Sequence, residues 1–179
     1  MDLQTKINNY EKQFPQSKLM LNNNVIEGIW VMGANYTTKS DLYGAYPYNY
    51  LKRVFALFPK TEKTLHLFSG SIEEGDCVDF KNGIDAHTMS EIIPNNYYDL
   101  ILADPPYSIE DCDHYGCCMI KRNVIFKECY KVLEKNGILI WLDQVLPNYR
   151  KDQFKIIARI GMVKSTNHRF RIITIFSKL

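Results

Sequence analysis

The stretch that most constrains the fold is a largely apolar run that ends in two prolines. Residues 99–103 (Asp-Leu-Ile-Leu-Ala) are followed by Asp104-Pro105-Pro106-Tyr107. A short apolar run bounded by Pro is typical of a buried strand that opens into a loop. Because paired prolines fix two φ angles and keep the residues before them extended, this loop is stiff. We expect its carboxylate and ring at the carboxyl end of a strand, where open α/β sheets bind ligands.

The rest of the chain alternates between strand and helix patterns. Strands are expected at 64–68, 76–80, 98–103, 137–142, 157–163 and 170–176, with a strand or turn at 25–32. Helices are expected at 48–58, 121–135 and 148–159, a helical or partly ordered segment at 1–24, and loops at 33–47 and 108–120. Asn136-Gly137 is a common helix stop and is predicted to end the second helix. This order predicts an α/β fold with a mostly parallel sheet and a C-terminal antiparallel hairpin.

Length and composition favour one cytoplasmic domain over residues 1–179. The chain is long enough to bury a core, and residues 1–47 are expected to form an N-terminal extension and loop. Its apolar runs are far shorter than the roughly 20 residues that span a bilayer, so no membrane partner is expected. The N-terminus lacks the pattern of a signal peptide. Five cysteines form no secreted framework, which favours reduced thiols.

Charge is distributed unevenly along the chain. Residues 64–149 carry 6 basic and 14 acidic side chains, whereas residues 150–179 carry 8 basic and 1 acidic. Clustered Lys and Arg attract phosphates, so the C-terminal segment is compatible with a nucleic-acid partner. A solvated basic face is the alternative interpretation, and the pattern alone does not separate the two.

Two further loops are candidate ligand contacts. Phe68-Ser69-Gly70-Ser71 follows an expected strand, and a Gly there lets a ligand approach the backbone closely. Asp79 ends the next strand, where a carboxylate accepts hydrogen bonds from ribose hydroxyls. Asp85-Ala86 follows, and an acid at this point suits an adenine amino group.

Together these residues resemble the S-adenosylmethionine-dependent amino-methyltransferases, most closely the N(6)-adenine DNA methyltransferases. Asp104-Pro105-Pro106-Tyr107 matches the catalytic tetrapeptide of that family, and Phe68–Ser71 resembles its cofactor loop. The resemblance spans roughly residues 48–179 and implies a Rossmann-like methyltransferase fold. It also implies S-adenosyl-L-methionine as cofactor, with Asp79 at the ribose and Asp85 and Ala86 beside its adenine. The chain departs from the family pattern at His66 and Ile72, and it has no obvious target-recognition domain.

The tetrapeptide has a physical rationale of its own. An exocyclic amino nitrogen is a poor nucleophile because its lone pair is delocalised into the ring. Hydrogen bonds from the amino group to the Asp104 carboxylate and the Pro105 carbonyl would draw that lone pair toward a methyl donor, and the charged acceptor would stabilise the developing positive charge. Tyr107 would stack on the base and hold its orientation. The structural alternative is that the two prolines only terminate a strand and have no role in catalysis.

Substrate contacts are expected on two segments near this platform. The candidates are Tyr115, Arg122, Asn167, His168 and Arg169. Aromatic and basic side chains of this kind stack on bases or bind phosphate. No metal is expected, because Cys112, His114, Cys117 and Cys118 fit no standard zinc spacing.

The function predicted from the sequence is methyl transfer to the adenine amino group in DNA. RNA methylation, at adenine N6 or guanine N2, remains an alternative, because ribosomal RNA guanine methyltransferases carry close variants of the tetrapeptide. Protein glutamine methyltransferases do so too, but a protein substrate leaves the basic C-terminus without a purpose. A third hypothesis is a non-catalytic nucleic-acid-binding subunit that keeps the fold. A homodimer or a partner subunit is compatible with a small catalytic domain that lacks a recognition module.

Overall fold

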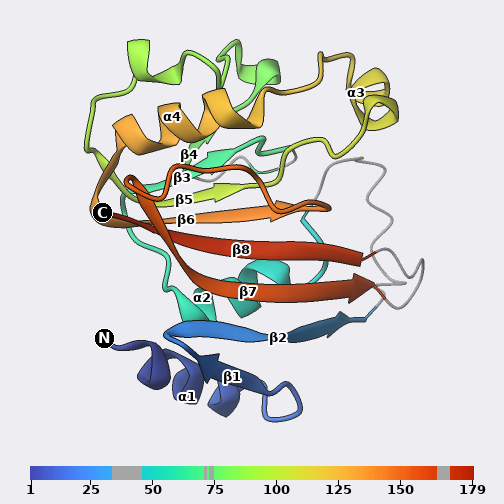
Figure 1. Cartoon of the computed structure of the whole chain (residues 1–179). Coiled ribbons are helices and arrows are strands. Elements are labelled where there is room, and N and C mark those ends of the chain that lie inside the picture. Colours follow the sequence, from blue (N-terminus) through green and yellow to red (C-terminus); the bar gives the residue numbers. More distant parts are fainter. Residues whose placement is uncertain (34–45, 71, 73–74, 165–169) are drawn as a thin grey trace.

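The protein is built on one eight-stranded sheet. The computed structural model describes residues 1–33, 46–70, 72, 75–164 and 170–179. The strands are β1 (Leu19–Asn22), β2 (Val25–Met32), β3 (Thr64–Leu67), β4 (Asp76–Val78), β5 (Tyr98–Ala103), β6 (Leu133–Asp143), β7 (Phe154–Lys164) and β8 (Phe170–Lys178). The helices are α1 (Leu3–Gln13), α2 (Tyr50–Leu57), α3 (Ile109–Tyr115) and α4 (Arg122–Val132). The strand order is β1-β2-β7-β8-β6-β5-β3-β4 (Figure 1).

The sheet is mixed, with parallel and antiparallel strand pairs. β3 pairs in parallel with β4 and β5, β5 with β6, and β2 with β7. β8 is antiparallel to both β6 and β7 and lies between them. The predicted α/β fold, Rossmann-like with a mostly parallel sheet and a C-terminal antiparallel hairpin, is confirmed.

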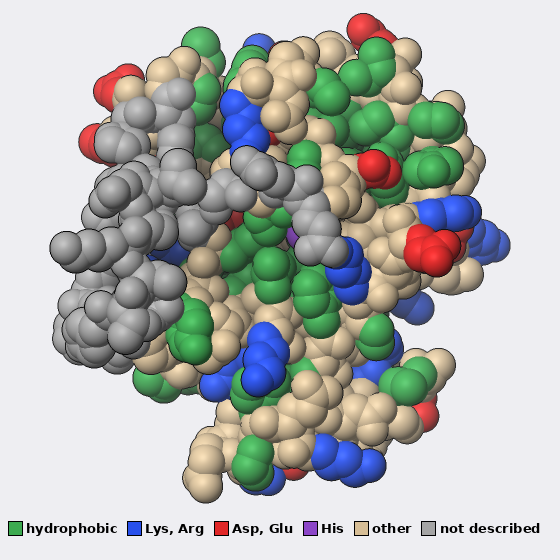
Figure 2. Space-filling model, turned by 180° about the vertical axis from the view of Figure 1, so that it is seen from behind, with side chains coloured by type: hydrophobic (Ala, Val, Ile, Leu, Met, Phe, Trp, Pro, Cys, Tyr) green, Lys and Arg blue, Asp and Glu red, His purple; other side chains and the backbone are tan. Residues whose placement is uncertain are grey.

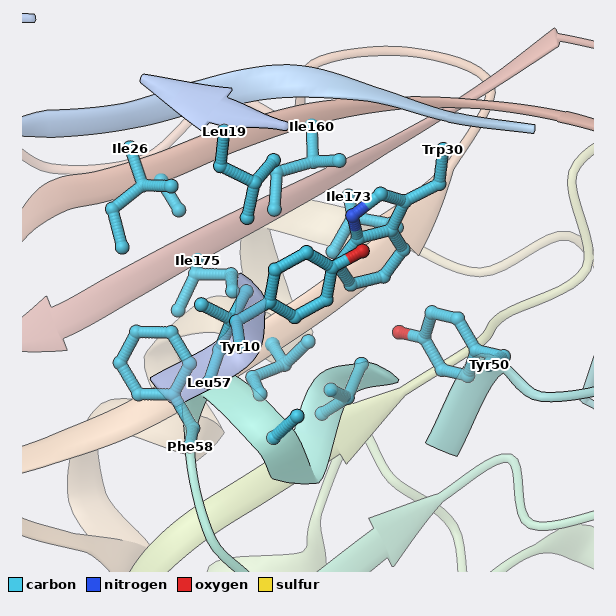
Figure 3. Close-up of a cluster of buried hydrophobic side chains, with 14 of the residues drawn as sticks. Tyr10, Leu19, Ile26, Trp30, Tyr50, Leu57, Phe58, Ile160, Ile173 and Ile175 are labelled. Carbon is cyan, nitrogen blue, oxygen red and sulfur yellow. The ribbon is translucent and has the colours of Figure 1, made fainter. Parts of the chain in front are cut away.

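Helices cover the two faces of the sheet and bury a core on each. On one face, α1 and α2 pack against β2, β7 and β8, and Tyr10 stacks on Trp30 with ring centroids 5.7 Å apart (Figure 3). On the other face, α4 buries Phe126 against Trp141 and Phe176. Both faces of the central strands are therefore buried, which explains why β5 and residues 137–142 of β6 are almost continuously apolar.

The N-terminal segment is part of this sheet. β1 and β2 pair with each other as a hairpin, and β2 continues the sheet beside β7. The expected helix near the N-terminus is present as α1, where the Asp2 side chain accepts a hydrogen bond from the Thr5 amide and caps the helix. No sequence pattern distinguished β1 from the polar residues around it, so this strand was not predicted.

Two predicted elements were wrong in kind or in extent. The helix expected at 148–159 is not there, because β7 begins at Phe154 and is held on both sides by β2 and β8. Tertiary pairing therefore overrides the local helical pattern. The helix expected to run to residue 135 ends at Val132. Asn136, at a φ of 63°, instead lies inside β6, at a break in its pairing with β5.

None of the helices within the described residues is long and apolar enough to cross a bilayer.

Candidate active site

Two of the predicted loops start side by side at the carboxyl edge of the sheet. β3 lies between β4 and β5. The chain adds β4 on one side of β3 and then adds β5 on the other side, so the strand order reverses at β3. Leu67 at the end of β3 pairs with Ala103 at the end of β5, and the Asp104 amide lies 3.5 Å from the Leu67 carbonyl oxygen. Ligands of open α/β sheets bind at such a reversal of strand order. The fold thus brings Phe68–Gly70 and Asp104–Tyr107 together.

Asp104 sits in an environment that disfavours its charge. Burial raises its pKa to about 6, although a hydrogen bond from Tyr107 and the charge of Arg171 lower it. The carboxylates of Asp143 and Asp111 act in the same direction as burial. A carboxyl group poised near neutrality at a loop edge is typical of a functional site.

Tyr107 is held against Asp104 by contacts on several sides. Its hydroxyl donates a hydrogen bond to Asp104 Oδ1, and its amide donates one to Asp111 Oδ2 at 3.2 Å. The Arg171 guanidinium lies over the ring, 4.8 Å from its centroid. Burial, followed by the Asp104 charge, raises the pKa of Tyr107 far above its usual value, so the phenol remains a donor. The predicted stacking ring is present and is already covered by a cation.

Ser108, the residue after the tetrapeptide, begins a helix that the sequence did not reveal. Its side chain caps α3 by accepting a hydrogen bond from the Asp111 amide, at 3.2 Å. The segment 108–120, expected as a loop, therefore contains a short helix. This helix fixes the position of Asp111, which in turn holds the Tyr107 backbone.

The structure adds three side chains that the sequence did not single out as site residues. These are Tyr46, Tyr50 and Arg171. Tyr46 and Tyr50 stack with centroids 5.2 Å apart, and burial raises the pKa of both well above the usual value, with the Asp104 charge adding to it. Both hydroxyls and Arg171 Nε are buried without a hydrogen-bond partner in the described part of the chain. Buried polar atoms of this kind are rare unless a ligand or water completes them. Tyr46 belongs to a tyrosine-rich stretch of the sequence, residues 43–48.

The loop after β3 has the backbone of a ligand-binding turn. Phe68 and Gly70 adopt positive φ angles of 58° and 55°. Ser69 is 1% exposed, and its hydroxyl has no hydrogen-bond partner among the residues described. A buried hydroxyl without a partner fits a ligand with polar groups at this loop. Ser71 lies outside the described residues.

Asp79 stabilises the same loop through hydrogen bonds to its backbone. Its Oδ2 accepts a hydrogen bond from the Gly70 amide at 3.1 Å, and its Oδ1 accepts one from the Lys81 amide at 3.1 Å. Lys81 Nζ also donates to the Gly70 carbonyl oxygen. The carboxylate thereby fixes Gly70 and caps a 3-10 turn at Phe80–Asn82. Each carboxylate oxygen has a further lone pair, so the predicted ribose contact remains a prediction.

Asp85 and Ala86 lie further along this edge. Asp85 Oδ1 accepts a hydrogen bond from the His87 amide at 2.8 Å and lies 2.7 Å from His87 Nδ1. Partial burial would raise the pKa of Asp85, but the His87 hydrogen bonds outweigh it and leave the pKa below its usual value. Ala86 is buried in the core beneath. His87 Nε2 in turn accepts from the Lys121 amide at 3.0 Å, which joins this loop to the start of α4.

The predicted substrate contacts divide into three cases. Arg122 makes a two-pronged ion pair with the fully buried Asp143, with N–O distances of 2.7 Å and 3.1 Å. Those nitrogens are engaged in the fold rather than presented to phosphate. Tyr115 is the last residue of α3. Asn167, His168 and Arg169 lie outside the described residues.

The described side chains form no metal cluster, and a cavity lies apart from the candidate site. The five cysteines are free, and no group of three or more His, Cys, Asp or Glu side chains among the described residues has the arrangement of a metal site. A cavity of about 400 Å³ lies at the other end of the sheet, among residues of the α1–β1 connection, Ile29, Val31 and Arg53. None of the predicted site residues lines it.

Comparison with known proteins gives weak structural neighbours. No family model matches the chain, and no curated protein does. One solved structure that resembles it is TrmN from Thermus thermophilus, with a TM-score of 0.42 and 16% identity, covering 65% of this chain and 43% of the other. Another is a Sulfolobus solfataricus protein described as a type 11 methyltransferase, with a TM-score of 0.42 and 16% identity, covering 76% of this chain and 94% of the other. The chain thus spans less than half the length of the first neighbour.

Proposed function

We propose that this protein transfers a methyl group from S-adenosylmethionine to the exocyclic amino group of adenine in DNA. The observation that carries the proposal is the placement of Asp104–Tyr107 at the strand-order reversal, directly beside the Phe68–Gly70 turn. The first supplies an acceptor and a ring for an aromatic amine. The second supplies a turn with an unpartnered hydroxyl for a polar ligand.

The residues of the chain that would hold the cofactor are Ser69, Gly70, Asp79 and Asp85. Ser69 offers a hydroxyl, and Gly70 offers a backbone without a side chain at a positive φ. Asp79 and Asp85 offer carboxylate oxygens to hydroxyl or amino groups. When bound, S-adenosylmethionine supplies a methyl group on a sulfonium centre, which is already activated for transfer.

Asp104 and Pro105 would prepare the amine. The carboxylate and the Pro105 carbonyl oxygen accept its two hydrogens, which turns the nitrogen lone pair out of conjugation. A carboxylate in a partly dry site stabilises the developing positive charge more strongly than water does. With a pKa of about 6, Asp104 is mostly ionised at neutral pH and can take up the proton that the amino group releases. Tyr107 would hold the base by stacking on the ring face that the Arg171 guanidinium does not cover.

A nucleic-acid substrate is supported by the charge of the C-terminal segment, with 8 basic residues against 1 acidic in residues 150–179. Figure 2 shows basic side chains distributed around a central hydrophobic area on the side opposite to that of Figure 1. A base in a duplex has to be flipped out first, at a cost of about a few kcal/mol.

The test supplies labelled S-adenosylmethionine with duplex DNA, single-stranded DNA and RNA, digests each product to nucleosides and determines their masses. We expect N6-methyladenine from DNA. Label in RNA as N6-methyladenine or N2-methylguanine would replace the DNA assignment. Calorimetry that detects no S-adenosylmethionine or S-adenosylhomocysteine binding at millimolar ligand would favour a non-catalytic subunit instead.

A further inference from the structure

Arg171 is the one cation that contacts the Asp104–Tyr107 pair among the described residues. It lies in β8 and pairs in register with Met162 of β7, so it points to the same face of the sheet as the buried Ile173. That face also carries α2 with Tyr50. The antiparallel strand β8 thus delivers a cation to the carboxyl edge of the parallel strands.

The Arg171 side chain packs against Tyr107 and is not a free surface charge. Its guanidinium covers the Tyr107 ring at 4.8 Å, and a stacked arginine of this kind stabilises the ring position. Its Nε is buried and lacks a hydrogen-bond partner in the described ranges. Arginine is the residue least able to lose its charge when it is buried.

We propose that Arg171 is a positioning residue, whose stacked guanidinium holds the Tyr107 ring and supplies a positive charge near the Asp104 carboxylate. The other groups that act on the Asp104 carboxyl are Tyr107, Asp111 in α3 and Asp143 in β6. Asp104 in turn acts on Tyr46 before α2 and on Tyr50 in α2, and His66 of β3 lies near Tyr46. Asp111 and Asp143 are acids, and the Asp143 charge is matched by Arg122. Arg171 is therefore the cation that acts directly on Asp104.

The inference rests on the proposed function only for its effect on catalysis. Asp104 has to be ionised to accept the amino hydrogens, so loss of the Arg171 charge would move the acidic limb of the rate profile to higher pH. The conservative change to Lys keeps the charge and loses the planar stacking, so it separates the two contributions. Lys should hold the pH profile and raise KM for the nucleic acid.

The deciding experiment is a carbon-13 NMR titration of the Asp104 carboxyl in the whole chain, with the signal assigned by Asp104→Asn. We expect the midpoint to rise by about one pH unit in Arg171→Met and to stay near the wild-type value in Arg171→Lys. Arg159→Met is the matched control, because Arg159 lies in the neighbouring strand and pairs with Glu27. If Arg171→Met does not fold, Arg171→Gln replaces it as the neutral variant.

Equal midpoints in the wild type and the neutral variant would overturn the inference, whether or not methyl transfer is detected. A shifted midpoint in a protein that transfers no methyl group would leave Arg171 as a support of Asp104 and overturn only the proposed reaction. The two failures are thus distinguishable.

Discussion

Asp79 and Asp104 occupy equivalent positions, each one residue beyond a strand that flanks β3, yet their surroundings differ. Asp79 follows β4, and both of its carboxylate oxygens accept backbone N–H groups. Asp104 follows β5 and faces buried tyrosines, a cation and two other acids. An acid whose two oxygens each accept a backbone amide shapes the loop around it, whereas a partly buried acid beside a cation and a phenol is available to a substrate.

The largest effect should come from Asp104→Ala, which removes the charged acceptor. We expect methyl transfer to fall by about a hundredfold or more, with the affinity for S-adenosylhomocysteine largely kept. Labelled-methyl incorporation and calorimetry measure the two quantities. Full activity in this variant would end the assignment of Asp104 as the acceptor.

Asp104→Asn should stabilise the fold while it removes the charge. The pKa of Asp104 in the folded chain, about 6, exceeds the ordinary value of 3.8, so the folded state binds the proton more tightly between these values. Stability of the wild type therefore falls as pH rises through this window, and the Asn variant escapes this loss. We expect a gain of about 1–3 kcal/mol at pH 7 that shrinks toward pH 4, measured by denaturant unfolding. A variant less stable than wild type at pH 7 would contradict the contrast with Asp79.

Asp79→Ala should destabilise the fold, in contrast to Asp104→Asn, because it removes the acceptor of the Gly70 amide and the cap of the 3-10 turn. A loss of about 1 kcal/mol in unfolding free energy is expected, together with weaker S-adenosylhomocysteine binding. Asp79→Asn is the control, since its amide oxygen can still accept one of the two hydrogen bonds. Unchanged stability in Asp79→Ala would show that the loop does not depend on this tie.

Tyr107→Phe keeps the ring and removes the hydroxyl that donates to Asp104. Because that hydrogen bond lowers the pKa of Asp104, its loss should shift the acidic limb of the rate profile upward by a fraction of a pH unit. Rates measured from pH 5 to 8 would check this. Tyr130→Phe, in α4 and outside the site, should leave the limb in place.

Asp85→Asn should have the smallest effect on the fold. The Asp85 side chain is 42% exposed, so its contact with His87 contributes only a few tenths of a kcal/mol. Since the pKa of Asp85 is depressed in the folded chain, that contribution exists above its ordinary pKa and disappears as pH falls below it. Weaker S-adenosylhomocysteine binding at pH 7, with stability nearly unchanged, would support Asp85 as a cofactor contact.

The strands around the site could be predicted because the sequence signals that specify them are local. The apolar run before Pro105 and the Gly after β3 each act over a few residues, and both strands are present. The helix expected at 148–159 failed because pairing with β2 and β8, distant in sequence, decides that segment.

The site was predictable in its centre and not in its surroundings. Asp104 and Tyr107 belong to one tetrapeptide, so their proximity follows from chain connectivity. Arg171 and Tyr50 reach them only through the order of strands and the packing of α2, which spacing in the sequence does not show. Arg122 was expected at phosphate, but its buried partner Asp143 lies 21 residues away.

The central position of β8 has a consequence for how the molecule is made. Within the sheet, β6 is connected to β7 only through β8, residues 170–178, which comes after both of them in the chain. During translation the two halves of the sheet therefore have no shared hydrogen-bonded neighbour until these residues emerge from the ribosome. Assembly of the Arg171 support would therefore wait for β8, so a nascent chain that stops short of residue 170 should hold the Asp104 loop without its cation.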